Sequence, residues 1–226
     1  MTECPAIIAA LPRELKPLVR GWKEHLLPGR IVAYTHESAV AVCAGMGPAR
    51  AALAVQAAFS LKTVTALLSV GLAGACDPSL RIGDIVRAGV VIDAHTGERF
   101  VGELSAPVLI STSAIASVRE KQRLYASYRA SVVDMEAATV ARLAQAHNVA
   151  FRAIKSISDE ASFEMRELAR FATGDGQFRE AAFAMHAAVR PQSWPKLFAL
   201  TGNSRRAVEA LTDELESQLN WYRQKA

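Results

Sequence analysis

The stretch "SVVDMEAATVARLA", residues 131–144, indicates the fold class because it places a short buried strand directly before a helix. The apolar "SVV" is typical of a strand, and the alanine-rich segment 135–147 is predicted to form a helix. Two carboxylates, Asp134 and Glu136, stand at this junction, where an apolar run would otherwise enter the core. A helix cap is the simplest explanation of Asp134 taken alone. The rest of the chain decides whether the junction is also a site.

The same alternation of strand and helix continues on both sides of this stretch. We predict strands at 6–11, 30–35, 39–45, 63–71, 84–97, 106–112 and 149–158, and helices from Pro12 and at 48–61 and 115–128. Residues 30–35 and 39–45 are predicted to pair as a hairpin. Downstream of 160 the chain is predicted to be mostly helical, with a turn at Gly202–Ser204 that separates two helices.

Apolar strands without internal alternation indicate a sheet that is buried on both faces. We therefore predict one α/β domain over residues 1–226, with a mixed sheet flanked by helices and a helical C-terminal portion from about residue 160. The 226 residues include 21% charged side chains, with a net charge of only +4. The basic residues are scattered, so we expect no nucleic-acid partner.

The cysteine and histidine patterns bear on metal binding and on the redox compartment. The three cysteines lie far apart, and no pair of histidines has the spacing of metal ligands. We expect reduced thiols, no metal and a cytoplasmic protein. The sequence shows no signal peptide and no apolar stretch long enough to span a bilayer, which leaves room for transient contact with a membrane surface.

Four polar or glycine-rich features follow predicted strands. They are Glu14, the glycine-rich segment 71–77, the pair Asp134 and Glu136, and the pair Ser158 and Asp159. Ligands of such sheets bind at the carboxyl ends of the strands, so we expect these features on one rim. A cap explains any single acid, but it does not explain three acids on the same rim.

Two glycine motifs invite other interpretations. The segment "CAGMGPARAA" (43–52) has Arg50 where a dinucleotide-binding fingerprint needs glycine or alanine, which argues against a Rossmann dehydrogenase. Gly47 instead permits a sharp turn into the next helix, where backbone amides can meet an anion or a ribose. The segment "SVGLAGA" (69–75) lacks the order of a serine hydrolase elbow.

Five segments together resemble the nucleoside phosphorylase and nucleosidase superfamily, which includes methylthioadenosine/S-adenosylhomocysteine nucleosidases. They are "AALPRELKPL", "AGMGPARAA", "VGLAGA…LRIGDIV", "VVDMEAATVA" and "IKSISDEA", in the family's order between about residues 6 and 160. The C-terminal "GQFREAAFAMHAAVRPQSWPKLFALTGNSRRA" is similar to the hopanoid-associated phosphorylase branch, which acts on adenosylhopane in hopanoid side-chain synthesis. The resemblance implies the nucleoside phosphorylase fold and cleavage of a purine N-glycosidic bond.

The resemblance also implies roles for individual residues. Glu136 matches the family glutamate that binds the ribose hydroxyls, Met135 packs against the sugar, and Asp159 is the acid that protonates the purine at N7. Ser158 orients the base, and Glu14 stands where nucleosidases activate water. The remaining implied binding positions are Lys155, near the water and the ribose, and the glycines Gly47 and Gly71. For this chemistry we expect Asp159 to be held protonated by burial or by a neighbouring carboxylate, and Glu136 to stay ionised.

Two departures from the family bear on the substrates. Residues 69–72 read "SVGL" where phosphorylases carry an arginine and a serine for phosphate, which favours water as the nucleophile. Phosphorolysis, with inorganic phosphate as co-substrate, stays open because Arg13, Arg50 and Lys155 offer positive charge. The segment 94–105 is shorter than in the nucleosidases, which leaves the 5′ side of the nucleoside open and suits a bulky apolar substituent.

The interpretation from sequence is therefore a cofactor-independent enzyme that cleaves a small-molecule adenine nucleoside carrying a 5′ substituent. The resemblance implies a homo-oligomer. The alternative from another class is a non-catalytic nucleoside-binding protein. Retention of Glu14, Glu136 and Asp159 argues against it, since binding alone would tolerate amides at these positions.

Overall fold

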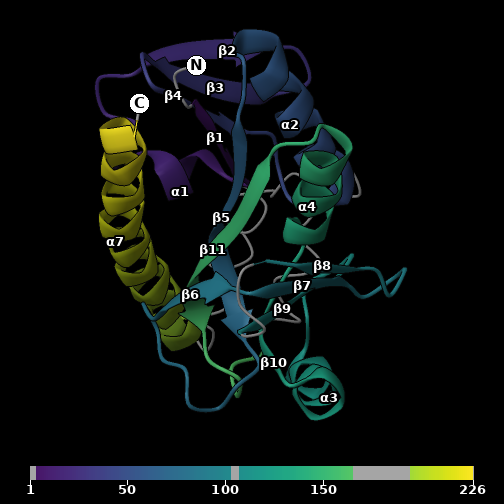
Figure 1. The fold of residues 1–226 in the computed structure, drawn as a ribbon. Helices are drawn as coiled ribbons and strands as arrows, with labels where there is room; N and C mark the ends of the chain where they lie inside the picture. Colours follow the sequence, from purple (N-terminus) through teal and green to yellow (C-terminus); the bar gives the residue numbers. More distant parts are fainter. Residues whose placement is uncertain (1–3, 103–106, 165–193, 226) are drawn as a thin grey trace.

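The first strand, β1 (Pro5–Ala9), is buried along its whole length and explains how the layers form. Ala6 and Ile8 belong to an apolar cluster with α2 (Pro48–Leu61) and α4 (Ala137–Ala146). Ile7 and Ala9 belong to a second cluster with α1 (Pro12–Leu15) and α7 (Trp194–Lys225). Alternate residues of one strand thus enter opposite cores, which is why its sequence is continuously apolar. Figure 1 shows α7 and the pair α2 and α4 on opposite sides of the sheet.

The computed structural model describes residues 4–102, 107–164 and 194–225. Within them an 11-stranded mixed sheet runs in the order β2-β3-β4-β1-β5-β10-β9-β7-β8, with β11 paired to β5 and β6. The further strands are β2 (Lys23–Leu27), β3 (Ile31–His36), β4 (Ala39–Cys43), β5 (Ala66–Ala75), β6 (Ile85–Ala88), β7 (Val90–Asp93), β8 (Arg99–Val101), β9 (Val108–Ser111), β10 (Ala130–Asp134) and β11 (Ala150–Asp159). The remaining helix is α3 (Val118–Tyr128). The predicted α/β class and the hairpin of β3 and β4 are confirmed.

The central strand β5 is paired differently along its two edges, and this pairing creates the site. On one edge β1 runs parallel to the first part of β5, and its last paired residue, Ile8, lies opposite Ser69. On the same edge β10 runs antiparallel to the far part of β5, and Val133 lies opposite Gly74. The carboxyl ends of β1 and β10 therefore face each other across the interval of β5 between Ser69 and Gly74. The other edge of β5 is covered by β11, which is parallel to it.

The expected glycine-rich loop at 71–77 is the main correction to the predicted fold. β5 continues through Gly71 and Gly74 to Ala75, so both glycines lie inside a strand. A β-carbon at Gly71 would lie 3.2 Å from a carboxylate oxygen of Glu14, and one at Gly74 would lie 2.9 Å from a carboxylate oxygen of Asp159. Glycine in a strand often marks such a close approach. The glycines leave room for the acids and do not end the strand.

Other boundaries also differ from the prediction. The predicted strand 84–97 is two strands, because the chain changes partner at Gly89: β6 pairs with β11, and β7 pairs with β9. The edge strand β2 was not predicted, since its mostly exposed residues carry no apolar pattern. β8 was also missed.

The C-terminal segment contains one continuous helix, α7, where two were predicted. Gly202 lies inside it and costs about 1 kcal/mol relative to alanine. The burial of Leu211, Leu215 and Leu219 against the sheet holds α7 in place. Residues 165–193, with Pro191, lie outside the described part of the chain.

Two sequence-level expectations concern the thiols and the membrane. The three cysteines are free, with Cys43 and Cys76 buried and Cys4 half-buried. None of the helices in the described ranges combines the length and the apolar character needed to cross a membrane.

Candidate active site

The interval of β5 between the ends of β1 and β10 opens into a cavity of about 690 Å³. This volume lies within the range of small-molecule sites. Glu14, Met135, Glu136, Ser158 and Asp159 all line it, together with Asp134. The predicted convergence of the three acids on one cavity is confirmed by the geometry. Of the other predicted binding positions, Gly47, Gly71 and Lys155 lie beneath or beside the lining and are not part of it.

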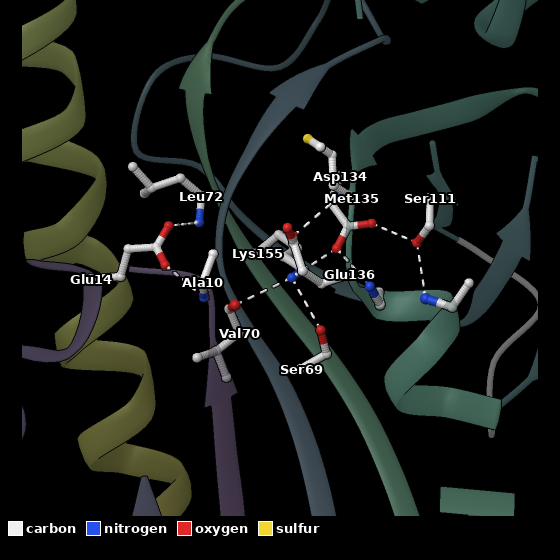
Figure 2. Close-up of polar contacts among 12 residues, drawn as sticks. Ala10, Glu14, Ser69, Val70, Leu72, Ser111, Asp134, Met135, Glu136 and Lys155 are labelled. Carbon is white, nitrogen blue, oxygen red and sulfur yellow. Dashed lines mark hydrogen bonds and ion pairs between the residues drawn. The ribbon is translucent and has the colours of Figure 1, made fainter. Parts of the chain in front are cut away.

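Glu14 is placed by the sharp turn that follows β1 into α1. Its Oε2 atom accepts hydrogen bonds from the backbone N–H groups of Ala10 (3.1 Å) and Leu11 (2.9 Å). Its Oε1 atom accepts from the N–H of Leu72 at 3.3 Å, so the carboxyl group bridges the turn and β5 (Figure 2). Burial raises the pKa of Glu14 above its ordinary value, and the amides of Leu11 and Leu72 partly offset this. The result is a fixed carboxylate with a raised pKa, as a base for water requires.

Glu136 stands at the start of α4, directly after β10. Its Oε1 atom accepts a hydrogen bond from the N–H of Gly47 at 2.7 Å. Gly47 has φ +91°, a conformation that favours glycine, and a β-carbon there would contact the methyl group of Met135 at 3.8 Å. Gly47 thus supports Glu136 and Met135 from below, and direct contact of Gly47 with a ligand stays a prediction.

Asp134 and Lys155 form a buried ion pair under Glu136, with 2.9 Å between the Lys155 ammonium and Oδ2 of Asp134. The ammonium also donates to Ser69 Oγ at 3.1 Å and to the Val70 carbonyl at 3.2 Å (Figure 2). Ser111 donates to the other oxygen of Asp134 at 2.6 Å. The side chain of Lys155 is only 1% exposed, so its role here is to hold the acids, and contact with substrate stays a prediction.

The cap interpretation of Asp134 is also confirmed. Its Oδ2 atom accepts from the N–H of Ala137 at 3.0 Å, in the first turn of α4. Ser111 Oγ in turn accepts from the N–H of Ala138 at 2.9 Å. Asp134 therefore caps α4 and binds Lys155. These contacts explain why two acids stand at the strand–helix junction, because Asp134 helps to position Glu136.

The pKa of Glu136 is raised from about 4.5 to about 7, first by burial and next by the negative charge of Asp134. Burial lowers the pKa of Lys155, but the carboxylates of Asp134 and Glu136 outweigh it and hold the pKa above its ordinary value. The carboxyl groups of Glu14, Asp134 and Glu136 surround the Lys155 ammonium, and its single positive charge does not compensate three negative charges. Glu136 is the carboxyl group that responds by keeping its proton to higher pH.

Asp159 ends β11, where the register with β5 shifts between Ile157 and Asp159. Such a bulge redirects a side chain, and here it places both Ser158 and Asp159 on the cavity. Ser158 Oγ lies 2.7 Å from Oδ1 of Asp159 and donates to it. The ammonium of Lys121 forms a buried ion pair with Oδ2 of Asp159.

The environments of Asp159 and Glu136 differ in part from the expectation. Asp159 was expected to be buried or to have a carboxylate neighbour. It is buried, but the charged group that contacts it is the ammonium of Lys121. Glu136 was expected to stay readily ionised, but its pKa is raised to about 7. The Lys121 contact joins elements that are distant in sequence, whereas the pKa of Glu136 is raised by burial and by Asp134, two residues before it.

Two parts of the site were missed from sequence. Lys121 lies on α3, which reads as a charged surface helix, yet the lysine is buried. A signal was present, because Lys121 stands three residues after Val118 and three before Leu124, on the inward face. The second part is α7, which contributes Thr201, Ser204, Arg205, Val208 and Glu209 to one wall of the cavity.

The raised pKa of Glu136 predicts a pH dependence of stability. A carboxyl group with a folded-state pKa near 7 binds its proton more tightly than in the unfolded chain, where the pKa is near 4.5. This contribution to stability is fully present below about 4.5 and is lost as the pH rises to about 7. We expect the free energy of unfolding of the wild type, relative to Glu136→Gln, to fall across this range. Urea unfolding at half-unit pH steps measures it. Exposed Glu37→Gln is the control, and a flat difference would contradict the prediction.

Comparisons with known proteins agree with this fold. The model of the phosphorylase superfamily matches residues 6–108 and 104–190. A search of curated proteins found no match. Among solved structures, futalosine hydrolase of Helicobacter pylori has a TM-score of 0.68 and 18% identity, with 97% of this chain and 98% of that chain covered.

Two further solved structures are similar over nearly their whole length. The 5′-methylthioadenosine/S-adenosylhomocysteine nucleosidase of Helicobacter pylori has a TM-score of 0.68 and 17% identity, covering 97% of this chain and 98% of that one. A protein of Weissella paramesenteroides that is assigned as a methylthioadenosine nucleosidase has a TM-score of 0.66 and 20% identity, covering 95% of this chain and 99% of that one. At these identities the structures support the fold. The family model spans more than half of the sequence, and the chain belongs to the phosphorylase superfamily.

Proposed function

We propose that this protein hydrolyses the N-glycosidic bond of an adenine nucleoside that carries a 5′ substituent. The observation that supports this most is that Glu14, Glu136 and Asp159, from three separate elements, line one cavity of nucleoside size. The solved structures of the same fold include nucleosidases and a futalosine hydrolase. Cleavage of the purine–ribose bond leaves positive charge on the sugar and negative charge on the base, so it requires acids with different roles.

Glu14 is the proposed base for water. It is held by three backbone N–H groups. Among the described residues its Oε1 atom accepts one hydrogen bond, the 3.3 Å contact from Leu72, which leaves acceptor capacity for a water molecule. Its raised pKa brings it closer to the pH at which a base works best. Water then attacks the anomeric carbon while Glu14 takes its proton.

Glu136 and Met135 are the proposed ribose contacts. Hydrogen bonds from ribose hydroxyls favour the carboxylate form of Glu136 and oppose the burial that raises its pKa. The ionised group then lies close to the sugar on which positive charge develops. Nucleoside binding is therefore coupled to loss of a proton from Glu136 below about pH 7.

Asp159 is the proposed acid for the leaving base, and Ser158 is the residue that orients its carboxyl group. Proton transfer breaks the O–H bond of the protonated Asp159 and forms an N–H bond at N7 of the purine. The adenine leaves neutral, and Asp159 returns to the carboxylate that its contact with Lys121 stabilises.

Water is favoured over phosphate by the surroundings of Glu14. Of the three cations that the sequence offers for an anion site, Arg13 lines the cavity, as Arg20 and Arg205 also do, but Arg50 donates to the Gly29 carbonyl at 2.6 Å and lies outside the lining. Lys155 is committed to Asp134. Leu72 presents an apolar side chain next to Glu14, and the negative charge of Glu14 repels a phosphate dianion.

The 5′ substituent is proposed to be large and apolar, as in adenosylhopane of hopanoid side-chain synthesis. Leu11, Pro17, Met46, Ile115 and Val208 contribute apolar surface to the cavity. No described residue of the hairpin of β7 and β8 lines it. A lipid-like substrate implies transient contact with a membrane surface. Homo-oligomer formation and a cytoplasmic location also stay predictions.

The test is release of free adenine from two substrates, methylthioadenosine and an adenosine with a large apolar 5′ group. We expect release without added phosphate, and faster release from the apolar substrate. Ribose-1-phosphate-type product that forms only when phosphate is present would overturn hydrolysis. Faster turnover of methylthioadenosine would overturn the apolar 5′ group, and binding of both nucleosides without any release would favour a non-catalytic binding protein.

A further inference from the structure

Lys121 has an unusual place in the fold. It lies on α3, between the half-buried Glu120 and the exposed Arg123, which pair with each other, yet its own side chain is 1% exposed. Lysine is almost never fully buried unless a partner compensates its charge. Lys121 also lines the cavity beside Asp159, so the buried charge belongs to the site and not to the core alone.

The contacts of the Lys121 ammonium fix its position. It donates to Oδ2 of Asp159, to the Glu160 carbonyl at 3.0 Å and to the Phe163 carbonyl at 3.3 Å. An ammonium group has three N–H donors, and all three have acceptors here. The other carboxylate oxygen of Asp159 accepts from Ser158. Asp159 is therefore held from both sides, by α3 and by its own strand.

The ion pair of Lys121 and Asp159 occupies space that is open because residue 74 is glycine. A β-carbon at Gly74 would lie 2.9 Å from Oδ2 of Asp159 and 3.0 Å from Cε of Lys121. Gly74 lies in β5, so three elements meet at this contact. Any larger residue at this position would displace the lysine, the carboxylate or both.

We propose that Lys121 is a positioning residue, which orients the Asp159 carboxyl group towards the leaving base and compensates the negative charge that Asp159 carries once it has given up its proton. This inference rests on the proposed function. When Asp159 gives its proton to the base, the carboxylate that forms is already paired with an ammonium, so the product of the transfer is stabilised.

The other titratable groups described around Lys121 and Asp159 do not replace the positive charge of the lysine. Burial, with a smaller contribution from Asp159, raises the pKa of Cys76 to about 12, so this thiol is neutral. Glu120 on α3 is paired with Arg123, and the carboxylate of Glu164 lies 3.4 Å from the N–H of Val118. Across the cavity stand the carboxyl groups of Asp134 and Glu136. Lys121 is the cation in contact with Asp159 within the described ranges.

The test is the pH profile of kcat/KM for adenine release. In Lys121→Met we expect the alkaline limb to move up by about 1–3 pH units, because an opposite charge in contact favours the carboxylate by this amount. Lys121→Arg keeps the charge and should leave the limb within about half a unit of the wild type. Gly74→Ala keeps both partners but separates them, and we expect a smaller shift in the same direction.

Two controls match these variants. Lys62→Met removes an exposed lysine, and Gly202→Ala adds a methyl group that meets no atom within 4 Å. Both should reproduce the wild-type profile. A uniform loss of activity in Lys121→Met, with an unmoved limb and no rescue by Lys121→Arg, would show a merely structural role and overturn the proposal. If Lys121→Met does not fold, an alkaline limb of Gly74→Ala that matches the wild type would overturn the proposal instead. Failure of the wild type to release adenine would overturn the proposed function itself, which separates the two failures.

Discussion

Asp159→Asn is expected to lower kcat for adenine release by about 10²–10⁴-fold, the usual contribution of a positioned general acid. The amide has nearly the same shape as the carboxyl group and still accepts a hydrogen bond from Lys121, but it has no acidic proton to give to the leaving base. The bond between ribose and purine then breaks with an anionic leaving group. Single-turnover measurement of adenine release separates this chemical step from product release.

Asp93→Asn is the matched control for this substitution. Asp93 also ends a strand, β7, and pairs with a cation, Arg142, but it does not line the cavity. It should leave kcat unchanged. Unfolding in urea checks that Asp159→Asn is folded, since the substitution leaves the buried Lys121 without a carboxylate partner. Wild-type kcat in a folded Asp159→Asn variant would remove Asp159 from its proposed role.

Lys155→Met is expected to destabilise the fold by about 3–5 kcal/mol, the cost of breaking a buried ion pair. The substitution leaves the Asp134 carboxylate buried without its ammonium and removes a charge that lowers the pKa of Glu136. Urea unfolding at neutral pH measures the loss, and the substitution should raise the pKa of Glu136 further.

The double variant Lys155→Met with Asp134→Asn provides the critical comparison. It removes both charges, so part of the lost stability should return. Arg87→Met breaks an ion pair whose arginine is 63% exposed, and it should cost about 1 kcal/mol or less. Equal stability of Lys155→Met and the wild type would show that the buried pair has no structural importance.

The sequence was informative about the site where the signals are local. Glu14, Glu136 and Asp159 each follow a strand within short motifs, and the rule that ligands bind at strand ends predicted their convergence. The three do meet at one cavity. The continuous apolar strands likewise predicted a sheet with two cores, because this pattern depends only on alternation along each strand.

The errors arise where a residue's role depends on partners far along the chain. The strand was predicted to end at Gly71, with Gly74 in the segment after it, because a sequence does not reveal that β11 covers the other edge of the same strand. Gly202 reads as a break in a helix, because the packing of α7 against the sheet outweighs the low helix propensity of one glycine.

The sequence by itself determined which acids are present and at which strand ends they stand, since motif and alternation are properties of neighbouring residues. The tertiary structure alone decided their electrostatic environments. It docked α3 so that Lys121 contacts Asp159, and it placed Lys155 against Asp134 beneath Glu136. Charges act through space and depend on burial, so the proton affinity of each acid follows from which elements pack together and not from the order of residues.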